Sequence, residues 1–472
     1  MYKSILVFTV LVFSLKVYDA AKILAWFPVP SISHQVVFRP VTQELAKRGH
    51  ELDQAPKNLT EIDVHDICYE IWSKFFMMKQ DQMTDDVVQQ TEMILDVFIA
   101  AIDAQLNTKE MKDVINGTQK FDLLMIEACT LSALAISEVF KVPVIQISSF
   151  GEISGQLEAF GAPVHPFLYP MPFQKIQQLY MMWRMNNLKH KFKLPVQTMI
   201  NKHFGLNVPQ VQDLMRNVDL VLLNEHPLWS INRPVPPNVI YMGGELKSYL
   251  DSSKYGVIYI SFGTNVDPAV LPSKTIQMFI KWNQNKLPGR SQNIKISKWL
   301  PQSDLLQHPN IKLFITQGGL QWTNEAITAE VPVIGIPFLT DQWHNTEQYV
   351  HHGVGLQLEI KTLDEAKLKH SIETVIEDSS YQKNMVKLRN LMHDQPMSSL
   401  ERAVWWTEHV LRHGGACHLR APAANMSWPE YYELELVSII LGTLVVFISL
   451  VALNYVVQSS KKIMSRKKVK TA

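Results

Sequence analysis

The chain has 472 residues, of which 47% are hydrophobic and 19% charged, and its formal net charge is +1. This balance is ordinary for a folded protein and excludes the strongly basic domain that nucleic-acid binding needs. The length allows two domains of roughly 200 residues each. Only three cysteines are present, Cys68, Cys129 and Cys417. We therefore expect the hydrophobic core, rather than a framework of disulfides, to stabilise the fold.

Both ends of the chain have targeting patterns. The first residues, MYKSILVFTVLVFSL, contain one lysine and then an apolar run, which predicts a secretory signal peptide. Near the other end, the uncharged run LVSIILGTLVVFISLVAL is long enough to span a bilayer as a helix. The tail after it has six lysines or arginines and no acid. By the positive-inside rule this tail is cytosolic and the bulk of the chain lumenal, which is a single-pass type I topology.

Two further patterns concern the compartment. The last residues, KVKTA, resemble an endoplasmic-reticulum retrieval signal, although a basic stop-transfer tail produces the same pattern. Sequons at Asn58, Asn116 and Asn425 agree with a lumenal body. The sequence therefore predicts a glycoprotein of the endoplasmic reticulum membrane.

Strands and helices alternate through the first half. The apolar run AKILAWF predicts a strand, and a proline-broken loop leads from it to a helix that begins after Ser31 or Ser33 and ends near Gly49. FDLLMIEA and VPVIQISS are buried-strand runs on either side of the helical LSALAISEVFK, which makes one βαβ unit. Such units imply a parallel sheet covered on both faces. Residues 166–217 have helical spacing, and DLVLLNE closes this half as a strand.

A second α/β half follows a proline-rich linker near residues 232–238. Its strand runs are GVIYISFGT, NIKISKWL, IKLFIT, VPVIGIP and HHGVGLQLE, and helices from about residue 363 to 412 end it. We therefore predict two doubly wound Rossmann-like domains that face a cleft. The predicted bounds are 1–20 (signal peptide), 21–234 (N-terminal domain), 235–415 (C-terminal domain), 416–434 (juxtamembrane segment), 435–457 (transmembrane helix) and 458–472 (cytosolic basic tail).

Two glycine turns at strand ends predict an anion site. FITQGGLQWTNEA runs from a strand through Gly318 and Gly319 into a helix, whose first N–H groups and dipole favour an anion such as a diphosphate. A plain tight turn explains a lone Gly-Gly pair equally well. SFGTN, however, makes a second such turn at the same crevice, with hydroxyls from Ser261 and Thr264.

Polar residues after two other strand runs extend this pattern. Trp299 and Gln302 follow one strand, where they can stack on a planar base and hydrogen-bond to it. Asp341 and Gln342 follow another, where they can bind hydroxyls. Together with the glycine turns, these residues suit the base, phosphates and sugar of a nucleotide-sugar.

From Trp299 to Gln348 the chain resembles the donor-binding signature of the UDP-glycosyltransferases, and SISHQVVFRPVTQELAKRGHE and ITQGGLQ are similar to the insect members. The resemblance implies a GT-B fold, with the acceptor in the N-terminal domain and the UDP-sugar in the C-terminal domain. It also implies inverting, metal-independent transfer of a sugar, expected to be glucose, to a hydroxyl of small lipophilic acceptors, as in detoxification. The UDP-sugar is then the donor substrate, and no cofactor is expected.

The resemblance also assigns the donor-site residues. Trp299 would stack on uracil, Gln302 would bind the base or ribose, and Glu325 would bind the ribose hydroxyls. Asp341 and Gln342 would bind the sugar hydroxyls. The full donor set that it implies is Ser261, Gly263, Thr264, Trp299, Gln302, Gln317, Gly318, Gly319, Glu325, Asp341 and Gln342.

Two residues of the glycine turn depart from the family pattern. Gln317 stands where many relatives have histidine, and its amide can still donate to a phosphate. Trp322 stands where serine or glycine is usual. Its indole either displaces the phosphate or rotates away and packs toward the upper domain, and the sequence leaves both open. A lost hydroxyl-to-phosphate hydrogen bond would cost about 1–2 kcal/mol.

Inverting transfer needs a base that takes the proton of the acceptor hydroxyl. His34 lies at the start of the first helix and matches the catalytic histidine of the family in SISH. Relatives orient this histidine with an aspartate, and here Glu127 occupies the acid position or lies close to it, while Ser132 stands where some relatives have another aspartate. We therefore predict His34 and Glu127 as the catalytic pair. His50, past the helix end, is expected on the surface.

The chain also lacks segments that the family has. After Glu51, LDQAPKNLT offers no apolar strand, and a spacer is missing between Gly244 and Glu245. MFIKWNQN passes after a single residue, Lys286, to LPGRSQN, which leaves no room for a strand. Missing strands expose apolar faces and sheet edges, so we expect reduced activity. The alternative function is a catalytically weak or inactive relative that binds lipophiles or associates with active relatives, and the sequence leaves homo- or hetero-oligomer formation open.

Overall fold

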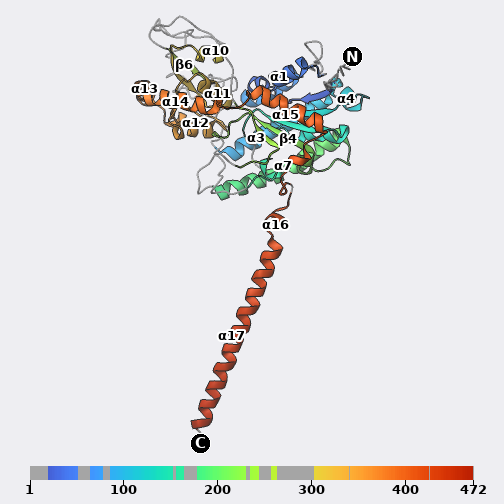
Figure 1. The fold of residues 1–472 in the computed structure, drawn as a ribbon, viewed down its shortest axis with the longest axis vertical. Coiled ribbons are helices and arrows are strands. Elements are labelled where there is room, and N and C mark those ends of the chain that lie inside the picture. Colours follow the sequence, from blue (N-terminus) through green and yellow to red (C-terminus); the bar gives the residue numbers. More distant parts are fainter. Residues whose placement is uncertain are drawn as a thin grey trace, which may run out of the picture.

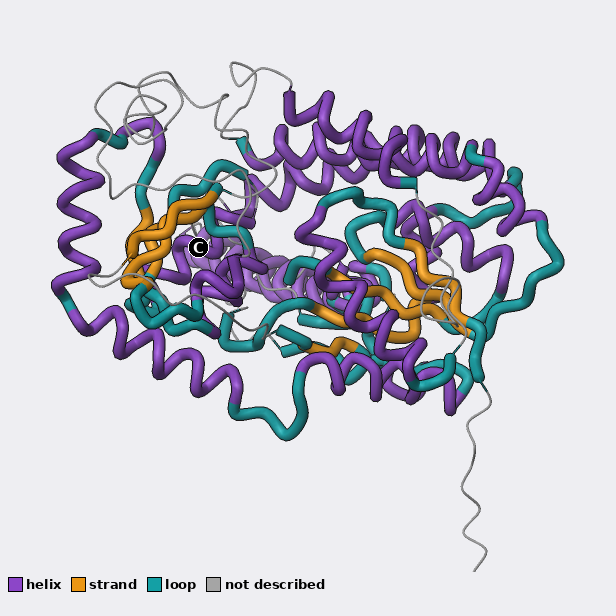
Figure 2. Tube along the Cα trace, turned by 90° about the horizontal axis from the view of Figure 1, so that it is seen from above, coloured by secondary structure: helices purple, strands orange, loops and turns teal. Residues whose placement is uncertain are grey.

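The computed structural model describes residues 20–50, 64–77, 86–151, 156–163, 178–229, 234–243, 257–262, 302–339, 341–424 and 426–470. Two parallel sheets surrounded by helices make up the body, and one long helix projects from it (Figure 1). Figure 2 shows the strands as two separate groups, each with helices around it. The expected α/β class is therefore confirmed.

The first sheet has five parallel strands in the order β1-β2-β3-β4-β5. Four of them form where apolar runs predicted strands, and β5 follows the proline-rich segment. The strands are β1 (Ile23–Trp26), β2 (Leu123–Glu127), β3 (Val144–Ser148), β4 (Val218–Leu223) and β5 (Val239–Tyr241).

Helices cover both faces of this sheet because successive strand side chains point to opposite faces. Leu124 and Ile126 of β2 pack with α3 and α7 on one face. Leu123 and Met125 pack with α1 and α15 on the other. The covering helices are α1 (Ile32–Lys47), α3 (Val87–Asn107), α7 (Gln178–Phe204) and α15 (Ser399–His413).

Shorter helices complete the first half. The segment between β2 and β3, expected as one helix, forms a 3₁₀ helix followed by a single α-helical turn, and all residues of the 3₁₀ part except Leu131 are buried. These elements are α2 (His65–Met77), α4 (Lys109–Asn116), η2 (Leu131–Ile136), α5 (Ser137–Phe140), α6 (Gln156–Ala159), α8 (Val211–Leu214) and η4 (Met215–Asn217).

The second sheet is also parallel, with the order β6-β7-β8-β9. Phe314 of β7 packs with α11 and α14, and its neighbours Leu313 and Ile315 pack with α13 on the opposite face. The strands are β6 (Val257–Ser261), β7 (Ile311–Thr316), β8 (Val333–Gly335) and β9 (Gly355–Gln357). The other elements are α10 (Gln302–Leu306), α11 (Leu320–Thr328), α12 (Asp341–His351), η6 (Ile360–Thr362), α13 (Glu365–Glu377) and α14 (Ser379–His393).

Each half of the chain contributes to the core of the other. Strand β5 and helix α15 come after residue 234, yet both pack on the first sheet, and Arg402 Nη1 of α15 donates to the Tyr241 carbonyl at 2.9 Å. Trp229, just after β4, is buried in the core of the second sheet, and its indole donates to Asn345 Oδ1 at 2.9 Å. These exchanged contacts bind the two sheets into one body.

His50 is buried, so the expected surface position is wrong. The start of the described chain runs over the end of α1, and Ala21 N donates to His50 Nδ1 at 3.3 Å. The other ring nitrogen lies 3.9 Å from a Glu408 oxygen of α15. Burial lowers the pKa of His50 in spite of that carboxylate. The three places where the sequence indicates missing segments, at 52–60, between Gly244 and Glu245, and at 278–293, lie outside the described residues.

The C-terminal segment ends in the helix that projects from the body in Figure 1. It comprises η7 (Cys417–Leu419), α16 (Trp428–Tyr431) and α17 (Leu434–Lys470). Within α17, the most apolar window of Leu434–Ser460 has a mean hydropathy of 2.8 and no buried residue, so the helix is long and apolar enough to cross a membrane. The predicted span 435–457 lies within this segment. The predicted signal peptide, apart from residue 20, lies outside the described residues.

Candidate active site

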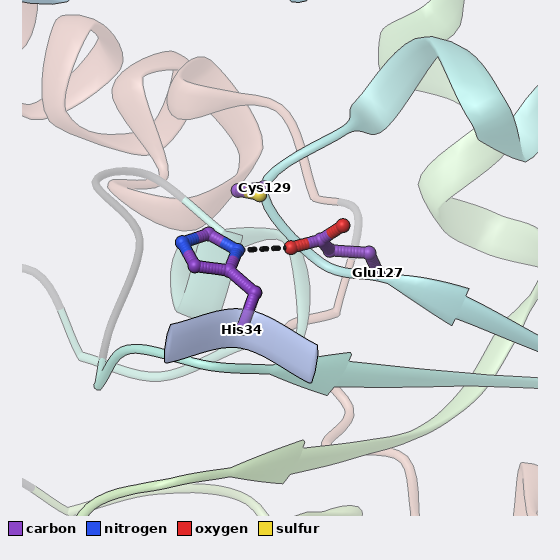
Figure 3. Close-up of side chains that lie close together, drawn as sticks. All are labelled: His34, Glu127 and Cys129. Atoms are coloured by element: carbon purple, nitrogen blue, oxygen red, sulfur yellow. Dashed lines mark hydrogen bonds and ion pairs between the residues drawn. The ribbon is translucent and has the colours of Figure 1, made fainter. Parts of the chain in front are cut away.

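His34 and Glu127 meet at the end of the first sheet. His34 is in the first turn of α1, where its N–H bonds to the carbonyl of Ser31, the N-cap residue, at 3.0 Å. Glu127 is the last residue of β2, and the first sheet is parallel, so its side chain stands at the carboxyl edge where ligands of such sheets bind. Figure 3 shows His34 Nδ1 directed at Glu127 Oε1, and the two are hydrogen-bonded.

The Glu127 carboxylate is fully buried and has further donors. Val29 N donates to Oε2 at 3.1 Å. Cys129 lies next to both catalytic candidates, and the ligand atoms of the three residues are within 4.8 Å of one another (Figure 3). Burial, followed by the charge and hydrogen bond of Glu127, raises the pKa of the Cys129 thiol well above its usual range. Cys129 therefore stays protonated and acts as a donor to the carboxylate.

The imidazole of His34 is held in one orientation. The ring of His34 meets the ring of Phe150 edge-on, with centroids 4.7 Å apart, and His34 is 4% exposed. Figure 3 shows the second ring nitrogen, Nε2, on the side away from Glu127. When Nδ1 carries the proton that Glu127 accepts, Nε2 has a free lone pair and can serve as a general base.

Gln302 and Glu325, both expected at the nucleoside, lie together at the second sheet. Gln302 Nε2 donates to Glu325 Oε2 at 2.9 Å, and Gln321 Nε2 donates to the other oxygen at 3.2 Å. Gln302 Oε1 is buried and has no hydrogen-bond partner in the part of the chain that the structure describes. A buried polar atom without a hydrogen-bond partner costs folding free energy. Gln302 Oε1 is therefore suited to accept a hydrogen bond from the N–H of a bound base.

Gly318 is required both by its backbone and by its neighbours. Its φ is +89°, and a Cβ placed on it would lie 2.5 Å from Cγ2 of Thr346 on α12. Asn345 Nδ2, on the same helix, donates to the Gly318 carbonyl at 2.8 Å. The first glycine therefore serves the close packing of α12 against the turn.

Gly319 is the N-cap of α11 and has an ordinary φ of −62°. A Cβ added to it would lie 3.1 Å from Cδ1 of Trp322 and 3.4 Å from Nε2 of Gln317. The indole of Trp322 packs against the core of the second sheet. It thus lies beside the start of α11, where the diphosphate is expected.

The sugar-binding candidates Asp341 and Gln342 begin α12. Asn345 Nδ2 also reaches Asp341 Oδ2 at 3.1 Å. Gln342 Oε1 accepts from the N–H groups of Phe338 and Leu339, both at 2.9 Å, so its carbonyl fixes the loop before the helix. Sequence reasoning missed Asn345, whose spacing of four residues from Asp341 on a helix is the available signal.

The rest of the expected donor set divides into two groups. Ser261 ends β6 and its hydroxyl is hydrogen-bonded to Tyr259, whose pKa is raised mainly by burial. Gly263, Thr264 and Trp299 lie outside the described residues.

Cys129, beside His34 and Glu127, was also missed by sequence reasoning. Its position two residues after Glu127, at a strand end, is the only signal for it.

Comparison with known proteins agrees with this arrangement. The sequence profile of the family described as "UDP-glucoronosyl and UDP-glucosyl transferase" matches residues 50–470. The "Ecdysteroid UDP-glucosyltransferase" of Spodoptera littoralis nuclear polyhedrosis virus is 32% identical over 480 aligned positions, which cover 89% of this chain and 93% of the relative. The 480 aligned positions exceed the length of the chain, so the alignment contains gaps in this chain. "UDP-glucosyltransferase 2" of Dactylopius coccus is 29% identical and covers 91% of each chain.

Solved structures give the fold. The "Glycotransferase of kitacinnamycin" superposes with a TM-score of 0.59 at 16% identity, covering 83% of this chain and 99% of its own. "CalG4, the Calicheamicin Glycosyltransferase" superposes with a TM-score of 0.58 at 15% identity, covering 84% and 99%. The chain therefore belongs to the UDP-glycosyltransferase family and is a glycosyltransferase enzyme of the GT-B fold.

Proposed function

We propose that this protein transfers glucose from UDP-glucose to a hydroxyl of small lipophilic acceptors, with inversion at the anomeric carbon, as in detoxification. The observation that carries the proposal is the buried pair of His34 and Glu127 at the carboxyl edge of the first sheet. His34 Nε2 takes the proton of the acceptor hydroxyl while the oxygen of that hydroxyl attacks the anomeric carbon. The bond from that carbon to the diphosphate breaks, UDP leaves, and Glu127 stabilises the imidazolium.

The second sheet supplies the proposed donor site. The free N–H groups at the start of α11 face the leaving diphosphate, and the Gln302–Glu325 pair holds the nucleoside. Ser261, Asp341 and Gln342 complete the set with the sugar and phosphate contacts assigned above. The proposal includes no metal ion and no cofactor, because the imidazole supplies the base and the helix start offsets the charge that develops on UDP.

Glucose and the acceptor class come from the relatives. The viral relatives are named as ecdysteroid UDP-glucosyltransferases and the Dactylopius coccus relative as a UDP-glucosyltransferase. We propose that acceptors bind in the N-terminal domain, and that a steroid alcohol belongs with phenols in any acceptor panel.

We also propose that the enzyme is a single-pass type I protein of the endoplasmic reticulum membrane, anchored by α17 with its basic tail cytosolic. Within α17, six lysines or arginines follow the apolar run and none precedes it. This distribution of charge supports a cytosolic tail. The sequon residue Asn116 is exposed at the end of α4, where a lumenal glycan would be accommodated. Protease protection of intact microsomes tests the orientation, and a body digested without detergent would contradict it.

The catalytic proposal is tested with the full-length chain in detergent, offered several radiolabelled UDP-sugars and a panel of phenols and steroid alcohols. We expect turnover with UDP-glucose and a loss of at least about 100-fold in His34→Ala. UDP must still raise the thermal midpoint of this variant, which shows that its donor site is intact. Unchanged turnover in His34→Ala would refute the assigned base.

A weak or inactive lipophile-binding relative remains the second candidate, favoured by the position of Trp322 beside Gly319. UDP titration separates the two. A stabilising shift that disappears in Gln302→Ala supports the enzyme, whereas acceptor binding without any UDP-induced shift supports the binding protein.

A further inference from the structure

A cluster of three histidines lies far along the chain from the candidate active site, at the end of α15. His409 and His413 are four residues apart on this helix, and His418 follows in η7. We call these three residues the histidine cluster. The Nε2 atoms of His409 and His418 are 3.1 Å apart, and the ring of His413 lies with its centroid 4.5 Å from that of His409 and 5.8 Å from that of His418.

The distance between His409 Nε2 and His418 Nε2 suits two ligands of one metal ion. Zinc bound to nitrogen at about 2.05 Å in a tetrahedral site holds neighbouring ligand nitrogens about 3.3 Å apart. The His409–His418 separation of 3.1 Å is close to that value. Histidines four residues apart on a helix share one face, so His413 is on the side from which it can join the pair. His413 is exposed, and its ring can change rotamer at little cost.

We propose that the histidine cluster binds one divalent transition-metal ion, with zinc as the probe, through the imidazoles of His409, His413 and His418. Three neutral imidazoles and a solvent molecule make a ligand set that zinc accepts. Nothing in the proposed catalytic step uses these residues.

The surroundings hold the central ring in place. His409 stacks on Trp405 with centroids 5.4 Å apart and meets Trp406 at 5.1 Å. Arg412 is the nearby cation that opposes metal binding, but it lies over Trp405 and 3.7 Å from Glu408, which offsets its charge. His409 is therefore held in place, while His413 and His418 are exposed to solvent.

A metal here would fasten the segment that leads to the membrane helix. Gly414 ends α15 with a φ of +64°, and Ala416 N then bonds to Asp219 Oδ1 of the first sheet at 2.8 Å. His418 lies just beyond this turn. An ion shared by His409 and His418 would tie the turn to α15, which itself packs on the first sheet.

The test uses the full-length chain with a tag that contains no histidine, stripped with a chelator and titrated with zinc in a calorimeter. We expect one equivalent of zinc to bind and the thermal midpoint to rise with zinc concentration. His409→Ala and His418→Ala should each weaken binding at least tenfold. The matched control is His370→Ala, an exposed histidine on α13, which should bind zinc as the wild type does.

A competing site must be separated from this one. Among the described residues, His34, Glu127 and Cys129 bring three ligand atoms within 4.8 Å of one another. Zinc binding that is lost in Cys129→Ser and kept in His409→Ala would overturn the proposal. The absence of any zinc binding would also overturn it, and the contact between His409 and His418 would then be a hydrogen bond only. Cobalt in place of zinc gives a second readout, and thiolate charge-transfer bands in its spectrum would contradict an all-imidazole site.

Discussion

At the scale of single residues, the proposed catalytic pair of His34 and Glu127 depends on what surrounds Glu127. Its carboxylate is buried and accepts from His34, from the Val29 N–H and from the Cys129 thiol. A buried carboxylate is tolerated only when such donors compensate the loss of water. The same donors fix its orientation, so the tautomer of His34 is set before any substrate arrives.

Replacing Glu127 by glutamine tests this role. The amide keeps the shape but removes the charge that stabilises the imidazolium, and it can present N–H to Nδ1 and favour the wrong tautomer. We expect kcat to fall about 100-fold or more with a small change in KM. The control is Asp122→Asn at the start of the same strand, where the carboxylate accepts from Lys22 N and is far from His34 along β2. A fall of similar size in both variants would argue against a catalytic role.

The residues at this site were predictable from sequence to different degrees. His34 and Glu127 follow from strand ends and from the family pattern. Cys129 did not, because its contact with Glu127 arises from the turn of the chain after β2, which apolar periodicity does not describe. The hydrogen bonds that Gln342 Oε1 accepts from the N–H groups of Phe338 and Leu339 were missed for the same reason.

At the scale of elements, the glycine turn before α11 combines a backbone need with a packing need. Gly318 has a positive φ, and a Cβ on it would clash with Thr346. Gly319 has an ordinary φ, so its backbone does not require glycine.

Apolar runs predicted nearly all the described strands, because parallel strands that are buried on both faces consist of continuous hydrophobic residues. The 3₁₀ helix η2 was not predicted, since its small and apolar residues suit an α-helix equally well.

Gly318→Ala measures the two needs separately. The added Cβ meets both a left-handed backbone and Thr346, so we expect a loss of about 2–4 kcal/mol in the free energy of unfolding. Gly205 has a similar φ of +91° with nothing within 4 Å of its Cβ position, so Gly205→Ala carries only the backbone strain. Denaturant unfolding of both variants gives the comparison. Equal losses would mean that Thr346 yields without cost.

Trp322 gives the second prediction for this element. Its indole lies beside the start of α11, so Trp322→Ser removes bulk and adds a hydroxyl that can donate to a phosphate. We expect KM for UDP-glucose to fall about 5- to 30-fold, the equivalent of about 1–2 kcal/mol. Trp322→Phe is the matched control, since it keeps a ring and adds no hydroxyl. An unchanged KM in the serine variant would place the indole outside the donor path.

At the scale of the whole molecule, the two sheets are joined by segments that cross between them. Helix α15 returns to the first sheet, Trp229 enters the second core, and Gln90 of α3 donates to the Phe338 carbonyl at 3.4 Å. The sequence predicted two halves but not these crossings, because contacts between distant segments leave no local pattern. His226 is part of this connection, with its Nε2 3.1 Å from Gln395 Nε2.

Acid should loosen this connection. Burial, with smaller contributions from Arg402 and His393, lowers the pKa of His226 from 6.5 to about 4. The unfolded chain therefore binds this proton more readily, and stability is lost as the pH falls from about 6.5 toward about 4. In His226→Gln the thermal midpoint should change less across this range than in the wild type. A variant with the same pH dependence would exclude His226 as a source of acid sensitivity.

Helix α17 has a consequence for how substrates arrive. Residues 420–433 are the only covalent link between the body and this helix, and a tether of this length reaches at most about 50 Å. With α17 in a bilayer, the point at which the body joins this tether stays within that height of the lipid surface, which keeps the body near the membrane. The proposed acceptors, oily alcohols and phenols, dissolve in lipid far better than in water, so an anchored enzyme would draw on a concentrated two-dimensional reservoir. Its working rate would then follow the partition coefficient of each acceptor as much as the fit of that acceptor to the protein.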